Sequence, residues 1–423
     1  MKDFILKGHI CYSENKDKIR ICPDSYLVCI DGRSAGVFTQ VPEQYQSLPI
    51  EDYGDKLILP GFVDMHIHAP QFSFRGNGMD MELLDWLYTY TFPEEGKYAE
   101  LAYADRAYTQ FVSAMRRSAT TRLCAFGTRH VEATELLMEK MEASGLVSYV
   151  GKVNMNRHCP DFLREKDAQT SLEDTERWIC DTQSKFKNTR PILTPRFIPS
   201  CTDELMQGLQ GLREKYHLPV QSHLSENHGE IAWVQELCPD SRFYGDAYEN
   251  FGLFGGDHPC IMAHCVHSGE EEIALMKKNG VYVAHSPMSN SNLASGIAPV
   301  SVYLERGLNV GLASDVAGGE TENMFRVMGD ALRVSKLRWR LVDQNVKPLS
   351  VDQVFYIATM GGGSFFGKVG SFAEGYEFDA IVLDDSKIEH PQHLDVRARL
   401  DRSLYLADDR HIAAKYVAGA KLF

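Results

Sequence analysis

Five residues able to bind a metal or move a proton each stand at the end of a short apolar run of this sequence. His66 and His68 close one run, and their spacing of two places both imidazoles on one face if the run is a strand. His223, His264 and Asp315 close three later runs. Imidazole and carboxylate groups gathered in this way are typical ligands of a divalent metal that activates a water for hydrolysis.

Glu226 follows His223 by three residues, which is close enough for its carboxyl to reach a water or a substrate beside such a metal. Taken singly, His223 or Asp315 is more often a hydrogen-bonded structural residue or a helix cap, and Glu226 is as readily a solvated acid in the first turn of a helix. The metal-site interpretation is favoured because all these residues follow similar apolar runs.

The runs themselves indicate the fold. Each apolar run is followed by a long segment compatible with a helix, which predicts eight parallel strand and helix units and hence a (β/α)₈ barrel, whose reacting groups sit at the C-terminal ends of its strands. A doubly wound open sheet is the alternative, and it lacks support because no Gly-rich phosphate turn is found. The eight runs are residues 58–68, 120–127, 147–154, 192–197, 219–223, 260–264, 281–285 and 310–315.

The two ends of the chain have a different character. Residues 19–22, 26–30 and 378–383 read as short strands bounded by turn residues. We therefore expect a small β-sandwich domain in which the two ends pair with each other, beside the barrel. The predicted boundaries are residues 1–57 and 368–423 for the small domain and 58–367 for the barrel.

Composition excludes several classes of function. A formal net charge of −14 disfavours nucleic acid and anionic lipid as partners, since both require a basic surface. No apolar run approaches the roughly 18 residues that cross a bilayer. The ten cysteines form no CxxC pair, as is typical of reduced thiols, so we expect a cytoplasmic protein with no nucleic-acid and no membrane partner.

Longer motifs carry a more specific resemblance. The sequence resembles the amidohydrolase superfamily over nearly its whole length and, within it, the guanine deaminases. The matching features are Gln71 and the segments PGFVDMHIH at 60–68, LDWLYTYTFPEE at 84–95, PRF at 195–197, HSPMSN at 285–290 and SDVAGG at 314–319.

The resemblance implies a single metal ion, expected to be zinc, with a water in its open position. Its ligands would be His66, His68, His223 and Asp315, although such a set also accepts iron or manganese. Relatives with two metals commonly bridge them with a modified lysine at the end of the fourth strand. This chain has Arg196 there, and no lysine, which favours one metal.

The resemblance also implies a reaction, the conversion of guanine and water to xanthine and ammonia. Three residues would be catalytic: Asp315 or Glu226 would take a proton from the metal-activated water, and His264 would hold or polarise that water. Glu226 would then protonate a ring nitrogen and the leaving amine. The resemblance further implies a homodimer.

The substrate would be a small purine, bound by side chains that can read a neutral planar ring. Arg196 offers a planar donor fork, Gln71 a donor and an acceptor, and Phe197 a wall or a stacking face. Trp86 and Phe92 are expected to pack within a lid segment. The predicted substrate-binding residues are Gln71, Arg196, Phe197, His223 and Glu226.

Other functions remain open at this stage. The same scaffold can deaminate 8-oxoguanine, cytosine, a triazine or an adenosyl nucleoside, and an inactive relative could serve as a binding protein. An amide-ring hydrolase resembling dihydropyrimidinase is disfavoured by the missing lysine. A second class of zinc deaminases pairs HxE with PCxxC, and although His130 and Glu132 match the first half, Ala263 stands where the second cysteine is required.

Overall fold

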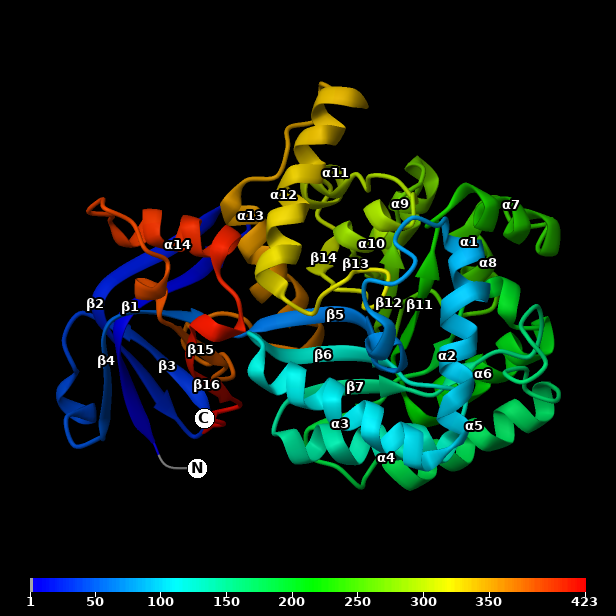
Figure 1. Ribbon diagram of the computed structural model, residues 1–423, viewed down its shortest axis with the longest axis horizontal. Helices are drawn as coiled ribbons and strands as arrows, with labels where there is room; N and C mark the ends of the chain where they lie inside the picture. The colour runs from blue at the N-terminus through cyan, green and yellow to red at the C-terminus, as the bar shows by residue number, and fades with distance from the viewer. Residues whose placement is uncertain (1–2) are drawn as a thin grey trace.

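The computed structural model describes residues 3–423 of the chain, and Figure 1 shows its two parts side by side. A twisted sheet lies on the left, and a ring of parallel strands surrounded by helices lies on the right. Among the described residues, no helix is both long enough and apolar enough to span a bilayer.

Both ends of the chain build the sheet on the left. Its strand order is β17-β16-β15-β4-β1-β2-β3, in one continuous seven-stranded sheet. β4 and β15 are antiparallel neighbours, with Ile58 opposite Val382, so the expected pairing of the two ends is confirmed. The strands are β1 (Phe4–Asn15), β2 (Lys18–Ile30), β3 (Arg33–Phe38), β4 (Ile50–Pro60), β15 (Ala380–Leu383), β16 (Ile412–Val417) and β17 (Ala420–Lys421).

Eight parallel strand positions form the predicted barrel. β5-β6-β7-β9 and β11-β12-β13-β14 are two parallel sheets, and β8 and β10 extend the third and fourth positions. A bridge between Leu193 and Val220 joins the two sheets on one side. The strands are β5 (Phe62–His68), β6 (Thr120–Phe126), β7 (Val147–Gly151), β8 (Val153–Asn154), β9 (Thr189–Pro191), β10 (Thr194–Pro195), β11 (Val220–Leu224), β12 (Cys260–His264), β13 (Tyr282–His285) and β14 (Asn309–Leu312).

The first predicted barrel run contains two strands of different sheets. Residues 58–60 end β4 of the small sheet, and the barrel begins with β5 after Gly61. A Cβ atom on Gly61 would lie 2.1 Å from Cγ2 of Thr121, so this position has no room for a side chain. Glycine is therefore required where the chain passes from the small sheet into the barrel. The last four residues of β4 are buried and apolar, as is the start of β5, so hydrophobic pattern alone does not separate the two strands.

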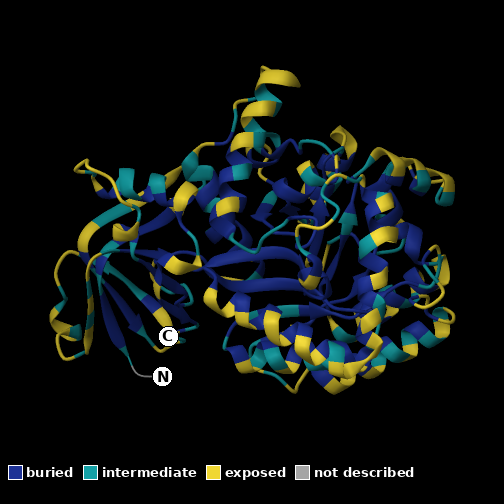
Figure 2. Ribbon diagram, in the orientation of Figure 1, coloured by how far each residue is buried: buried dark blue, intermediate teal, exposed yellow. Residues whose placement is uncertain are grey.

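Helices cover the outside of the barrel, with buried residues on one face and exposed residues on the other (Figure 2). In α3, for example, Ala104, Tyr108, Phe111 and Met115 are buried at the spacing of one helix face. The helices are α1 (Leu83–Trp86), α2 (Phe92–Gly96), α3 (Leu101–Arg117), α4 (Val131–Ser144), α5 (Ala168–Thr182), α6 (Asp203–Tyr216), α7 (His228–Leu237), α8 (Tyr244–Asn250), α9 (Glu270–Asn279), α10 (Pro287–Asn292), α11 (Val300–Glu305), α12 (Met324–Leu341), α13 (Val351–Tyr356) and α14 (Val396–Leu406).

Short turns of 3₁₀ or π helix complete the connections. Two are π turns, and one of them lies between α1 and α2, where residues 83–96 cross the C-terminal end of the barrel (Figure 1). The π turns are η3 (Leu87–Thr91) and η6 (Ile357–Gly361), and the 3₁₀ turns are η1 (Glu43–Tyr45), η2 (Ala69–Phe74), η4 (Lys97–Ala99), η5 (Ile198–Ser200), η7 (Ser364–Phe366), η8 (Asp385–Lys387) and η9 (Asp409–His411).

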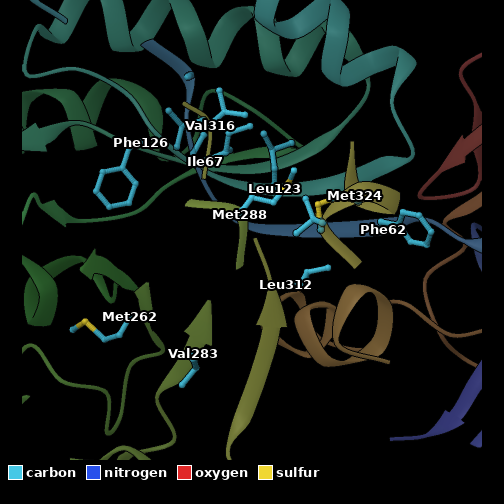
Figure 3. Packing of buried hydrophobic residues seen from close by; sticks show 14 of the residues in the cluster. Phe62, Ile67, Leu123, Phe126, Met262, Val283, Met288, Leu312, Val316 and Met324 are labelled. Carbon is cyan, nitrogen blue, oxygen red and sulfur yellow. The ribbon is translucent and has the colours of Figure 1, made fainter. Parts of the chain in front are cut away.

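Two apolar layers hold the strands in place. Small side chains such as Ala263, Ala284 and Ala313 belong to one buried cluster with Met65 of β5. Larger side chains, including Phe62, Leu123, Leu312 and Met324, form part of the cluster that contains the surrounding helices (Figure 3). The C-terminal ends of the strands are therefore rigidly placed, as a site built on them requires.

One buried ion pair connects the barrel to the small sheet. Nε of Arg122 in β6 lies 2.6 Å from Oδ2 of Asp379, the residue before β15, and both side chains are almost completely buried. Nη2 of Arg122 also lies 2.7 Å from Oε2 of Glu377. The guanidinium therefore neutralises a carboxylate that has little access to solvent.

We expect Arg122→Met to destabilise the protein by about 3 to 5 kcal/mol, because it leaves the Asp379 carboxylate buried without its cation. Urea unfolding monitored by circular dichroism measures the change. Arg177→Met is the control, since Arg177 and its partners Glu132 and Asp174 are exposed and each such pair contributes roughly 1 kcal/mol or less. Equal losses in the two variants would contradict a special role for the buried pair.

Candidate active site

Imidazole nitrogens and one carboxylate converge at the C-terminal ends of the barrel strands. Nε2 of His66 lies 3.2 Å from Nε2 of His68 and 3.1 Å from Oδ1 of Asp315. Nε2 of His223 lies 3.3 Å from Nε2 of His68. These four residues, predicted as ligands from the sequence, share one compact cluster.

His264 joins the same cluster from the end of β12. Its Nε2 lies 3.7 Å from Oδ2 of Asp315 and 3.4 Å from Oε2 of Glu226. Two overlapping sets of groups are close enough to hold one ion, with ligand atoms within 4.8 Å of one another: His66, His68 and Asp315, and His66, His223 and His264. His264, expected beside the water, thus lies as near to His66 and His223 as a ligand would.

In His223 and His264, a hydrogen bond to Nδ1 on the outer side of the ring turns Nε2 into the cluster. Nδ1 of His223 donates to the carbonyl oxygen of Arg196 at 2.6 Å, and Nδ1 of His264 lies 2.9 Å from Oδ1 of Asn290. When Nδ1 carries the proton, Nε2 of a neutral ring offers a lone pair. Burial holds the pKa values of His68 and His223 well below their usual range, which favours this neutral form.

This donor set fits a divalent cation. Lone pairs of His66, His68 and His223 directed at one another are unfavourable unless a cation or a proton lies between them. Burial opposes ionisation of Asp315, but the surrounding imidazoles, His66 first, outweigh it and hold the pKa of this carboxyl below its usual range. Neutral imidazoles with an ionised carboxylate are the form in which these side chains bind zinc.

Asp64 supports the cluster from beneath, and reasoning from the sequence did not identify it. Its Oδ1 accepts hydrogen bonds from the backbone N–H of Ser314 at 3.0 Å and of His66 at 3.3 Å. Asp315, the next residue, has a left-handed backbone with φ of 46°, which is uncommon outside glycine. Asp64 therefore fixes both chain segments that carry the central ligands.

Glu226 lies beside the cluster in a buried position. Burial raises the pKa of its carboxyl to about 7, so the group can both hold and release a proton near neutral pH. Ser295 Oγ donates to Oε1 of Glu226 at 3.1 Å. The backbone N–H of Glu226 donates to Oε2 of Glu230 at 3.1 Å. Glu230, four residues later and also buried, was not predicted.

A cavity opens directly from the cluster. Its apolar walls are Leu83, Trp86, Leu87, Phe197 and Leu293, and its polar walls include Gln71, Arg196, Glu226 and Glu230 beside His68, His223, His264 and Asp315. Trp86, expected only to pack within a lid segment, lies in α1 above the barrel and also lines the cavity. The structure thus brings eight of the nine predicted site residues to the cavity wall, and the ninth, His66, lies directly behind Asp315.

Gln71 and Arg196 are held by a residue that was not predicted. Nη1 of Arg196 lies 2.6 Å from Oε2 of Glu95, and Nε2 of Gln71 lies 3.0 Å from Oε1 of the same carboxylate. Phe92, expected to pack, has the Arg196 guanidinium 5.2 Å from its ring centre. The only signal for Glu95 was its place in the segment 84–95 that carried the family resemblance.

Comparisons with known proteins identify the family of this chain. Residues 57–420 match the model of the amidohydrolase family. Guanine deaminase of Dictyostelium discoideum is 35% identical, covering 99% of this chain and 98% of its own length, and that of Escherichia coli K12 is 34% identical, covering 91% and 86%. The crystal structure of guanine deaminase from C. acetobutylicum with bound guanine in the active site superposes with a TM-score of 0.97 at 47% identity, covering 100% of both chains. The chain therefore belongs to the amidohydrolase family and, within it, to the guanine deaminases.

Proposed function

We propose that this protein hydrolyses guanine to xanthine and ammonia. The observation that carries the proposal is that the histidine and aspartate cluster opens onto a cavity whose polar walls include Gln71 and Arg196. A metal-binding group and donors for a carbonyl-bearing ring therefore face the same small space. The relatives named guanine deaminase, one of them with guanine bound, identify the ring.

We propose that His66, His68, His223 and Asp315 hold one zinc ion, with His264 next to it. Iron or manganese would fit the same nitrogen and oxygen donors. When bound, such an ion lowers the pKa of a water towards neutrality and so supplies a nucleophile for hydrolysis.

Glu226 carries out the proton transfers. With a pKa of about 7, its carboxylate can take one proton from the attacking water and deliver it to a ring nitrogen. It can then take the second proton, from the hydroxyl group now on the ring carbon, and deliver it to the leaving amine. Asp315 is the other candidate for the first transfer. Burial disfavours a charge on His264, but Glu226 and Asp315 outweigh it and raise the pKa of His264. His264 would hold or polarise the water.

Ring recognition falls to Arg196, Gln71 and Phe197. Guanine is an uncharged planar ring with one carbonyl, which the guanidinium fork of Arg196 can bind, while Phe197 supplies an apolar wall. His223 and Glu226 bound the side where the amino group reacts.

A cytoplasmic location is supported by the cysteines, all ten of which are free thiols. The homodimer remains a prediction that rests on the family resemblance, and size-exclusion chromatography with light scattering tests it.

The purified protein should release ammonia and form xanthine from guanine far faster than it deaminates adenine, cytosine or 8-oxoguanine. Ammonia is measured directly, and xanthine is measured by the change in ultraviolet absorbance as the ring is converted. Comparable kcat/KM values for guanine and one of the other rings would contradict guanine as the substrate.

Elemental analysis should find about one transition metal per chain, because the predicted ligands form one cluster. His66→Ala should lose both the metal and the activity, since His66 belongs to both ligand sets. His393→Ala is the control, as this histidine is exposed and outside the cluster. Two tightly bound metals per chain would show that the single-metal assignment is wrong.

Glu226→Gln should retain the metal and the fold while turnover falls by about 10²- to 10⁴-fold, because the amide cannot transfer the proton. The exposed Glu236→Gln should have no effect on kcat. Metal content and steady-state kinetics are measured on both variants, and full activity of Glu226→Gln would remove Glu226 from the mechanism.

A further inference from the structure

Glu95 is a buried carboxylate close to the cavity that does not line it. It lies in α2, and only 2% of the residue is exposed. Both of its oxygens are used, Oε1 by Nε2 of Gln71 at 3.0 Å and Oε2 by Nη1 of Arg196 at 2.6 Å. The two partners are the polar side chains proposed to read the ring.

This arrangement fixes the orientation of both partners. A carboxylate only accepts hydrogen bonds, so Gln71 must turn its NH₂ group to Glu95. Oε1 of Gln71 then accepts a hydrogen bond from the backbone N–H of Ala317 at 3.3 Å. Arg196 is held on one side by Glu95 and lies over the ring of Phe92. Its remaining N–H groups are thereby presented in a fixed plane.

The same contact removes the net charge from the recognition side of the cavity. Arg196 is 3% exposed, and it forms an ion pair with Glu95. A buried pair of opposite charges leaves hydrogen-bond donors available without a net positive field. An uncharged ring can accept from these donors, whereas an anionic ring would be buried close to the Glu95 carboxylate.

We propose that Glu95 is a positioning residue that orders Gln71 and Arg196 in a charge-neutral frame and so makes the site select an uncharged purine over an anionic one. The proposal rests on the proposed function, because it concerns the ring that the site binds. It assigns to Glu95 a part in specificity without contact to the reacting atoms.

Glu95→Gln tests the proposal because it preserves volume and removes the charge. The new NH₂ group must face a donor on either Gln71 or Arg196, so one hydrogen bond is lost. We expect kcat/KM for guanine to fall about 10- to 100-fold, mostly through KM. Urate is an anion at pH 8 and serves as the competing ligand. We expect the ratio of KM for guanine to Ki for urate to be about tenfold higher in the variant than in the wild type.

Two further variants separate positioning from a general structural effect. Glu94→Gln alters the neighbouring buried glutamate, which binds Lys97 and not Gln71 or Arg196. It should leave the ratio of KM for guanine to Ki for urate unchanged. Glu95→Asp keeps the charge, so KM should rise while the ratio stays near that of the wild type. Metal content and Tm are measured throughout.

The proposal is overturned if Glu95→Gln weakens guanine and urate equally, or leaves both unchanged. If the wild type binds guanine without deaminating it, the proposed function is wrong but the role of Glu95 can still be tested. Calorimetry then gives Kd values for guanine and urate, and their ratio takes the place of the ratio of KM to Ki.

Discussion

The contact between β5 and the residues that follow β14 closes the barrel and assembles the candidate metal site at the same time. The backbone N–H of Asp315 donates to the carbonyl of His66 at 2.9 Å, and that of His68 donates to Val316 at 3.1 Å. Asp64 ties the same two segments together through Ser314. The ligands from the first and last strands can therefore meet only when the ring of strands is complete.

Arg196 links this metal-binding cluster to ring recognition. Its carbonyl accepts from Nδ1 of His223, which sets the tautomer of that ring, and its side chain is held by Glu95. One residue thus contributes to both functions through different atoms. A change in the backbone at this position affects the metal ligand even where the side chain is preserved.

Much of this arrangement follows from local patterns in the sequence. The eight barrel strands were predicted because each is a compact apolar run, and the metal-site candidates because they end such runs. The choice of ligands among these candidates came from the resemblance to the amidohydrolases. The division between β4 and β5 was missed, since an apolar run continues through Gly61 from one sheet into the other.

The supporting residues were missed for a different reason. Glu95 lies 101 positions from Arg196, and Asp64 lies 250 from Ser314, so each has its partner on a distant strand end. Nothing in the residues around an isolated aspartate or glutamate distinguishes a buried acceptor of this kind from a solvated acid. Only the assembled fold identifies them.

The pairing of β4 with β15 also governs the order in which the chain can fold as it leaves the ribosome. Ile58 finds its partner Val382 only after all the barrel strands between them have been synthesised. Until then the edge of β4 exposes unpaired backbone groups, directly before the strand that carries His66 and His68. The small sheet can therefore be completed only after the barrel strands have been synthesised, and its completion covers that edge of β4.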